Sequence, residues 1–175
     1  DKLAELWKTW EIWFADVEES HTTLPALVFF RSPRADNSWV TSAGAVLDSA
    51  AITLSSIDIP REMSAALCLR AGFISFHRIT DYFDIPHPHE PKFPETPISV
   101  TRAEYDDLIR KLEDAGLPIK SDREQAWKDF AGWRVNYDRT LLVMCSMVMA
   151  PQVPWSSDRA PKFKLPPLFL KKNKH

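Results

Sequence analysis

The sequence predicts an all-α protein, a helical bundle of about five to six helices with a proline-rich linker and an extended C-terminal arm. Apolar residues recur at alternating spacings of three and four, which is the period of an amphipathic helix. Glycine is scarce, with four in 175 residues, and most of the 14 prolines gather in residues 85–97 and 151–167. Few glycines and clustered prolines favour long helices joined by stiff connections. No stretch of convincing length shows the alternation of a strand.

Local signals predict where these helices begin and end. The capping box Thr101-x-x-Glu104 starts one helix, and Gly116, two residues before a proline, stops it. A second capping box, beginning at Ser121, starts the longest helix, which Pro151 ends. Helices are expected over residues 1–20, 24–31, 38–57 and 60–84, from Thr101 to Gly116, and over 122–150.

We expect residues 1–175 to form a single domain, because this length can bury a substantial core. Within it, residues 1–20 are a linker or assembly helix, 24–150 the core of the bundle and 151–175 the C-terminal arm. The end of the arm, PKFKLPPLFLKKNKH, mixes apolar residues with lysines. It could meet an anionic membrane surface or a partner groove, but an arm packed on its own domain or on a neighbouring copy is the preferred interpretation.

Charge and hydropathy exclude several classes of function. A formal net charge of −2 gives no basis for nucleic acid as a partner. No stretch reaches the roughly 20 apolar residues of a membrane span, so this chain is not expected to insert into a membrane. Cys68 and Cys145 lie in apolar helical stretches and are interpreted as small buried hydrophobes, as in a reducing compartment. A chain that begins with Asp1 rather than Met suggests an excised fragment.

Several charged side chains occur at positions that the helical period would bury. One narrow stripe of the segment 60–84 is charged although apolar residues surround the rest of it. Asp48 also projects from a face of small residues in the segment 38–57, and Arg134 interrupts the apolar seam of the segment 122–150. This candidate polar centre comprises Asp48, Arg70, His77, Arg78, Asp81 and Arg134.

We interpret five of these charges as one buried or half-buried ion network near the centre of the bundle. An unpaired buried charge costs several kcal/mol, so the charges are expected to neutralise one another. Two interpretations stay open: structural pairing that fixes the register of the helices, which is favoured, and a polar cavity that binds a small anionic ligand. The five are Asp48, Arg70, Arg78, Asp81 and Arg134.

A group of histidines follows the segment 60–84. His77 and Asp81 lie one turn apart, and His87-Pro-His89-Glu90 comes shortly after, so nitrogen and oxygen ligands for a divalent metal are present. The flanking prolines favour polyproline geometry, in which residues two apart do not share a face. A solvated loop is therefore preferred, and neither a metal nor a cofactor is expected. No catalytic motif appears, and we do not expect an enzyme.

Five stretches of the sequence together resemble one family. They are Glu19-Ser20-His21, FFRSPRADNSWV with GAVLDSAA, LCLRAG, SDREQAWKDFAGWRVNYD and APQVPWSSDR, and they span nearly the whole chain. They are similar to a family of bacterial ion-channel proteins in which a two-helix, potassium-channel-like pore is followed by a helical cytosolic domain. The pore and its selectivity filter are not in this chain, so ion conduction cannot be argued from its residues.

The resemblance implies a regulatory or assembly domain on the cytoplasmic face of the cell membrane. Its partner would be an upstream transmembrane pore segment of the same polypeptide, and the protein would be a homo-oligomer. The apolar seam of residues 1–20 would then pack against other subunits through Leu3, Trp7, Trp10, Phe14 and Val17. The alternative is a free-standing helical protein that binds a small anion through Arg70, Arg78 and Arg134. An enzyme with a metal near His77, His87 and His89 is the least favoured.

Overall fold

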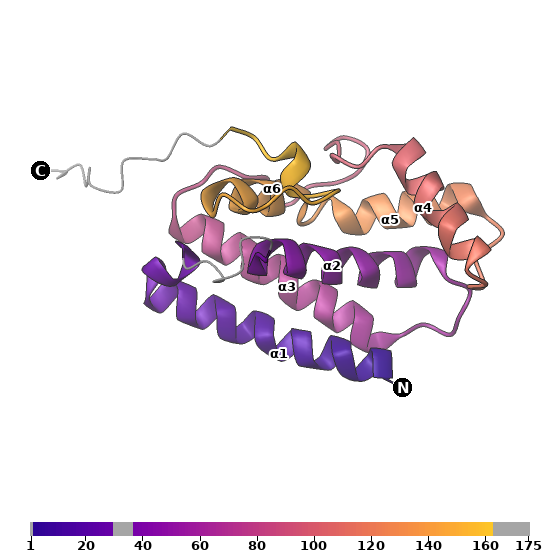
Figure 1. Ribbon diagram of the computed structural model, residues 1–175, viewed down its shortest axis with the longest axis horizontal. Coiled ribbons are helices and arrows are strands. Elements are labelled where there is room, and N and C mark those ends of the chain that lie inside the picture. Colours follow the sequence, from indigo (N-terminus) through magenta and orange to yellow (C-terminus); the bar gives the residue numbers. More distant parts are fainter. Residues whose placement is uncertain (1, 30–36, 163–175) are drawn as a thin grey trace, which may run out of the picture.

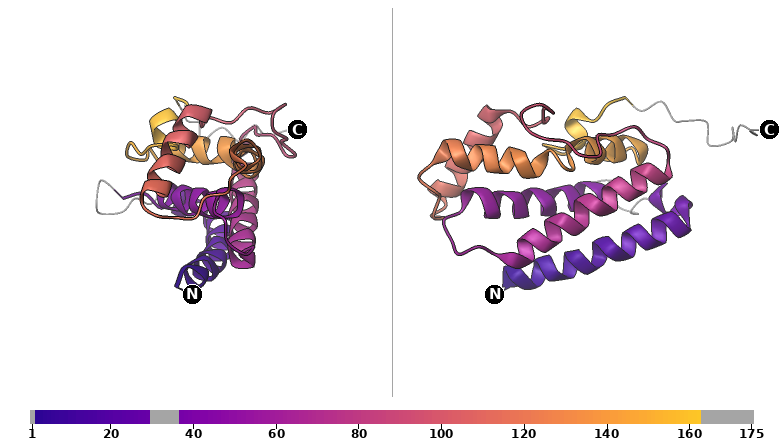
Figure 2. Two further views of the ribbon diagram at one scale, coloured as in Figure 1. Left: turned by 90° about the vertical axis from the view of Figure 1, so that its right-hand side faces the viewer. Right: turned by 180° about the vertical axis from the view of Figure 1, so that it is seen from behind.

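The computed structural model describes residues 2–29 and 37–162, and these residues form a bundle of six α-helices with no strand, as the sequence predicts. α1 lies on one side of the bundle, α2 and α3 occupy its middle, and α4, α5 and α6 lie on the opposite side (Figures 1 and 2). The elements are α1 (Lys2–Thr23), the 3-10 helix η1 (Pro25–Phe29), α2 (Trp39–Ser56), α3 (Met63–Tyr82), α4 (Arg102–Asp114), α5 (Arg123–Arg134), α6 (Asp138–Met147) and the 3-10 helix η2 (Ser157–Arg159).

α1 is part of the core, which corrects the prediction of a linker helix with an apolar seam free for other subunits. Trp7, Phe14 and Val17 are buried within this chain, and α1 packs along α3. Phe14 contacts Phe76 at a ring distance of 6.1 Å. Of the other two seam residues, Trp10 is half-buried against the core and Leu3 is 42% exposed. Periodicity identifies an apolar face but does not say which surface covers it.

Gly72 lies where α3 packs tightly against both α1 and α2. A Cβ atom added there would overlap the side chain of Leu47 on α2 and lie 2.9 Å from Cζ of Phe14 on α1. All three residues are buried. The absence of a side chain at this position therefore allows three helices to meet.

Gly72→Ala is expected to lower the free energy of unfolding by about 1–3 kcal/mol, because the extra methyl group overpacks the core. Gly132→Ala is the matched control. Gly132 also lies in a helix, but an added Cβ meets no other described residue within 4 Å, so alanine should stabilise the helix by up to about 1 kcal/mol. Urea unfolding of both variants measures the difference, and changes of the same sign would contradict this account.

The single long helix expected over residues 122–150 is two helices, which corrects that prediction. α5 ends at Arg134 and α6 begins at Asp138. The side-chain amide of Asn136 donates to the carbonyls of Gly132 and Trp133, at 2.9 and 3.1 Å, and so competes with continued helical bonding. The break is invisible to periodicity because the residues after it still face the core.

The two predicted capping boxes have different outcomes. The Thr101 box is present, with Thr101 accepting from the backbone of Glu104 and the Glu104 side chain reaching back. Gly116 adopts a φ of 86° just after α4 ends, which confirms the predicted stop. The second box is wrong, because α5 is capped by Asp122, whose side chain accepts from Gln125.

The remaining structural predictions concern the cysteines, the membrane and the arm. Cys68 and Cys145 are free and buried, as predicted, and burial raises the pKa of each thiol to about 12. None of the described helices combines the length and the apolar character needed to cross a bilayer. Residues 151–162 of the predicted arm contact the bundle through Trp155, which accepts from Arg134, and Arg159, which donates to Glu104. Residues 163–175, with the apolar and lysine-rich end of the arm, lie outside the described residues.

Candidate functional site

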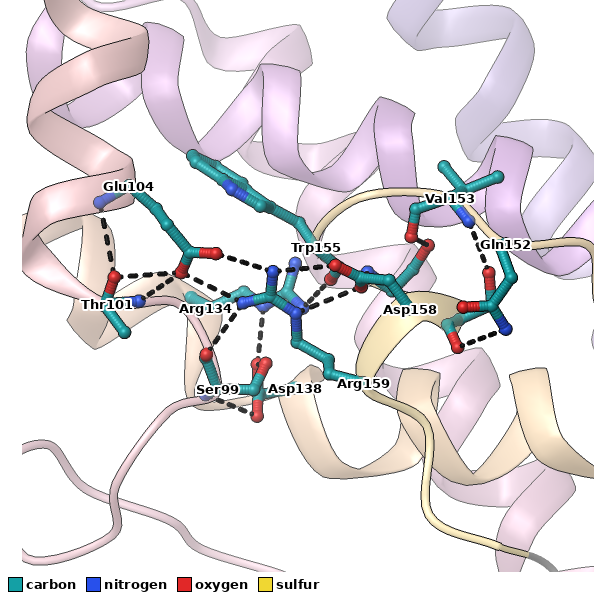
Figure 3. Close-up of polar contacts among 12 residues, drawn as sticks. Ser99, Thr101, Glu104, Arg134, Asp138, Gln152, Val153, Trp155, Asp158 and Arg159 are labelled. Carbon is teal, nitrogen blue, oxygen red and sulfur yellow. Dashed lines mark hydrogen bonds and ion pairs between the residues drawn. The ribbon is translucent and has the colours of Figure 1, made fainter.

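The polar centre of the bundle is built on Arg134, the last residue of α5. Its side chain is fully buried, and each guanidinium nitrogen donates to a different segment; Figure 3 shows Arg134 with Asp138 and Trp155. Nε donates to Asp138 on α6 at 2.8 Å, Nη1 donates to Asp48 on α2, and Nη2 donates to the carbonyl of Trp155 at 2.6 Å. We call Arg134, these three partners and Ser99 the Arg134 cluster.

Both carboxylates of the Arg134 cluster have further donors. Asp138 accepts from the backbone N–H of Ser99 at 3.0 Å and from its hydroxyl at 2.7 Å. Asp48 accepts from the Tyr137 hydroxyl at 2.7 Å. The guanidinium carbon of Arg134 lies 5.1 Å from the centre of the Tyr137 ring, within cation–π range. The cluster is therefore a hydrogen-bonded ion triad, the form in which buried charge is tolerated.

A second ion pair extends the Arg134 cluster toward α4. Arg159 donates to the carbonyl of Ser99 at 2.8 Å and to both carboxylate oxygens of Glu104, at 2.7 and 3.0 Å. Arg159 also pairs with Asp158. Glu104 of α4, Arg134 of α5 and Asp138 of α6 thus converge on the non-α-helical segments that carry Ser99, Trp155 and Arg159 (Figure 3).

Burial and charge set the protonation of the buried groups. Burial acts to lower the pKa of Arg134, but Asp48, Tyr137 and Asp138 raise it above its ordinary value overall. Burial, and then the charge of Asp48, raises the pKa of Tyr137 well above its usual range. Burial raises the pKa of Asp48, although Arg134 and the Tyr137 hydroxyl oppose that shift. Arg134 and Tyr137 therefore stay protonated as donors.

The structure brings Asp48 and Arg134 together but separates the other predicted members of the network, which is a correction. Arg70 is exposed on α3. Arg78 is also exposed and pairs with Glu18 of α1. Asp81 is exposed and faces His87 at 3.6 Å. Helical projection gives the direction of a side chain but not its depth, so it predicts too deep a position for residues at the edge of a stripe.

His77 also lies outside the Arg134 cluster. Its Nε2 is 2.6 Å from the carbonyl oxygen of Asn136, in the turn between α5 and α6. Because a carbonyl only accepts, Nε2 carries a proton. Burial is the main cause that lowers the pKa of His77, which favours the neutral ring.

The geometry of the Arg134 cluster does not suit an anionic ligand. Arg134 faces two carboxylates, so the local charge is negative, and all three of its nitrogens already donate to protein acceptors. Arg70 and Arg78, which the sequence predicts in the same network, are exposed and do not converge on Arg134. Of the two interpretations left open by the sequence, structural pairing is the one that these contacts favour.

A pocket of about 550 Å³ opens beside the Arg134 cluster, between α2, α4 and the segment 153–156. Its wall is largely apolar, with Ile52, Leu108 and Leu112 among the lining residues. Asp48 and Trp155 line it as well, so two members of the cluster form part of its surface. The other lining carboxylates are Glu104, paired with Arg159, and Asp107, paired with Lys111.

Sequence reasoning missed Ser99, Trp155 and Arg159 as members of this site. All three lie in loops or in the short η2, where no period predicts the direction of a side chain. Trp155 has a φ of 64°, in the left-handed region that an aromatic residue seldom adopts. Of this site the sequence predicts Asp48 and Arg134, because each is a charge on an otherwise small or apolar helical face.

The Glu104–Arg159 pair predicts how stability responds to acid. The hydrogen bonds from Arg159 are the main cause that lowers the pKa of Glu104 from 4.5 to about 2. A carboxyl with a depressed folded-state pKa contributes stability that is present above pH 4.5 and is lost as the pH falls toward 2. Urea unfolding across that pH window should show a shallower loss of stability for Glu104→Gln than for the unchanged protein. Glu95→Gln controls for the removal of one surface charge, and equal slopes for all three proteins would contradict the pairing.

The fold and the site define an all-α helical bundle with a buried ion triad. Scans against models of protein families, against curated proteins and against solved structures each find no match to this chain.

Proposed function

We propose that this chain is a regulatory domain on the cytoplasmic side of a bacterial potassium-channel-like membrane protein. In this proposal it acts through helix packing and the binding of a small ligand, and not by catalysis. The upstream pore segment of the same polypeptide and assembly into a homo-oligomer belong to the same proposal. One observation carries it: the stretches that resemble the channel family supply most of the Arg134 cluster.

The correspondence can be followed along the chain. The stretch GAVLDSAA contains Asp48, SDREQAWKDFAGWRVNYD contains Arg134 and Asp138, and APQVPWSSDR contains Trp155. These stretches are far apart in sequence, yet their polar side chains and the Trp155 carbonyl meet at one buried point. Segments that resemble one family and also contact one another at one buried site support the family proposal more strongly than segments that lie far apart in the structure.

The pocket suggests how a ligand would act. Its wall includes the segment 153–156, which Arg134 holds through the Trp155 carbonyl. A ligand there would contact α2, α4 and this segment together. The wall is mainly apolar and its carboxylates are paired, so a small, largely apolar ligand with a hydrogen-bond donor suits it. It would shift a gating equilibrium only by its difference in affinity between the two states.

α1 provides the mechanical connection in this proposal. It packs along α3, and α3 in turn packs on α2, which carries Asp48 and one side of the pocket. A pore helix ahead of α1 would therefore be joined to a helix that is buried in the core. A change in the packing of α2 and α3 would reach the pore through that helix.

The test uses the full-length protein read from the coding sequence that includes Asp1. Leu108→Trp fills the pocket from α4, and Ala103→Trp adds the same side chain at an exposed position of α4 that does not line the pocket. In vesicles, Leu108→Trp should change potassium flux while Ala103→Trp leaves it unchanged, with similar melting temperatures. A coding sequence with no pore segment would overturn the channel proposal, and equal flux for the two variants would overturn the role of the pocket.

A further inference from the structure

The chain after α3 folds back so that three side chains with metal-binding atoms meet. Asp81 lies in the last turn of α3, and His87 and His89 belong to the proline-rich segment that follows. One ligand atom from each residue lies within 4.8 Å of the other two. This arrangement differs from the polyproline geometry that the sequence suggested, in which His87 and His89 would not share a face. Their ring centres are only 4.9 Å apart.

His87 is the central residue of this group, and it does not lie in a solvated loop as predicted. Its side chain is only 1% exposed. Nδ1 lies 3.0 Å from the carbonyl oxygen of Ile85 and 3.3 Å from the hydroxyl of Thr80. Because a carbonyl can only accept, Nδ1 carries the proton, and Nε2 of the neutral ring presents a lone pair. A backbone carbonyl that fixes the other ring nitrogen is typical of metal-binding histidines.

The Nε2 atom of His87 is buried without a hydrogen-bond partner among the described residues. A polar atom buried in this way costs free energy unless something satisfies it. The carboxylate of Asp81 is nearby, at 3.6 Å from Nε2. That separation exceeds a hydrogen bond but is close to the roughly 3.4 Å between two ligands of a tetrahedral zinc ion.

His77 supports the group without being a ligand. Its ring packs edge-on against His87 with 4.7 Å between ring centres, and its Nε2 is held by the Asn136 carbonyl. His87 is therefore fixed by contacts on two sides. Asp81 and His89 are exposed, so their side chains can turn by the small amount needed to close on one ion.

We propose that Asp81, His87 and His89 form a binding site for a divalent transition-metal ion of the zinc type. Two imidazole nitrogens and one carboxylate are borderline ligands, which suit Zn²⁺ or Co²⁺ and do not suit Mg²⁺ or Ca²⁺. Three protein ligands leave a fourth position for water. The ion would join the segment after α3 to the end of that helix. This site is separate from the Arg134 cluster and does not depend on the proposed function.

The experiment measures zinc binding by the folded chain without a histidine tag. Protein dialysed against Zn²⁺ should retain one zinc per chain, and titration calorimetry should give one site. Co²⁺ should replace Zn²⁺ with the absorption of a tetrahedral site, whereas excess Mg²⁺ should not compete. Asp81→Asn and His89→Ala change exposed residues, so both variants should fold, and each should weaken zinc binding at least about tenfold.

Asp84→Asn is the matched control, because Asp84 is an exposed carboxylate three residues from Asp81 and outside the group. Asparagine also tolerates the positive φ of 54° at this position. This control should bind zinc as the unchanged protein does. The two cysteines do not compete, because both are buried thiols with a raised pKa. The absence of stoichiometric zinc, or equal affinity in Asp81→Asn, His89→Ala and the control, would overturn the site and leave only the close approach of His87 and Asp81.

Discussion

Arg134→Met is expected to lower the free energy of unfolding by about 3–5 kcal/mol, because it leaves buried carboxylates without their cation. Asp48 and Asp138 would keep their positions near the centre, and among the described residues only Tyr137 and Ser99 would remain as donors to them. The Trp155 carbonyl would also lose its donor. Urea unfolding followed by circular dichroism measures the change.

Two further variants separate charge from size in the Arg134 experiment. Arg70→Met removes the same kind of side chain from an exposed position of α3 and should change stability by less than about 0.5 kcal/mol. Adding Asp48→Asn and Asp138→Asn to Arg134→Met removes the uncompensated charges and should recover part of the lost stability. A mild effect of Arg134→Met, similar to that of Arg70→Met, would mean that the cluster is not a buried ion triad.

Phe14→Ala is expected to destabilise the whole domain by about 3–5 kcal/mol, as large cavities in a core do. The Phe14 ring is fully buried and contacts Phe76 of α3, and its backbone carbonyl accepts from the Ser75 hydroxyl at 3.0 Å. The cost should appear in one cooperative transition, because α1 and α3 share one core. Thermal unfolding followed by both tryptophan fluorescence and circular dichroism tests this point.

Ile12→Ala is the control on the same helix. Ile12 is 64% exposed, so its truncation should change stability by less than about 0.5 kcal/mol. If α1 were a linker helix that waits for other subunits, Phe14→Ala would be as mild as Ile12→Ala. Two separate transitions would likewise show that α1 is not part of the domain core.

The fold class and most helices could be predicted from the sequence, because amphipathic periods and end signals are local properties. The Thr101 capping box and the stop at Gly116 are examples, since each depends on a few neighbouring residues. The break between α5 and α6 could not be predicted in this way. It depends on the side chain of Asn136 bonding back to α5 while the apolar period continues through it.

The candidate site could be predicted only in part. Asp48 and Arg134 are charges in the middle of otherwise small or apolar faces, and that pattern identifies buried charge. Arg78 occupies a similar angle on α3, but its long side chain reaches Glu18 at the surface. The partners from loops, Ser99 and Arg159, carry no periodic signal. They become visible only when the chain is folded and the loops cross the ends of the helices.

The contact between Arg134 and the Trp155 carbonyl limits how far the protein can be shortened from its C-terminal end. Pro151 lies where the last helix has ended and would be a natural boundary on secondary structure alone. A protein shortened at that residue would lack Trp155 and Arg159, and with them an acceptor for the central guanidinium and the cation that binds Glu104. We therefore expect the minimal folding unit to extend through Arg159, and limited proteolysis should spare the short stretch from Pro151 to Arg159 although it contains no α-helix.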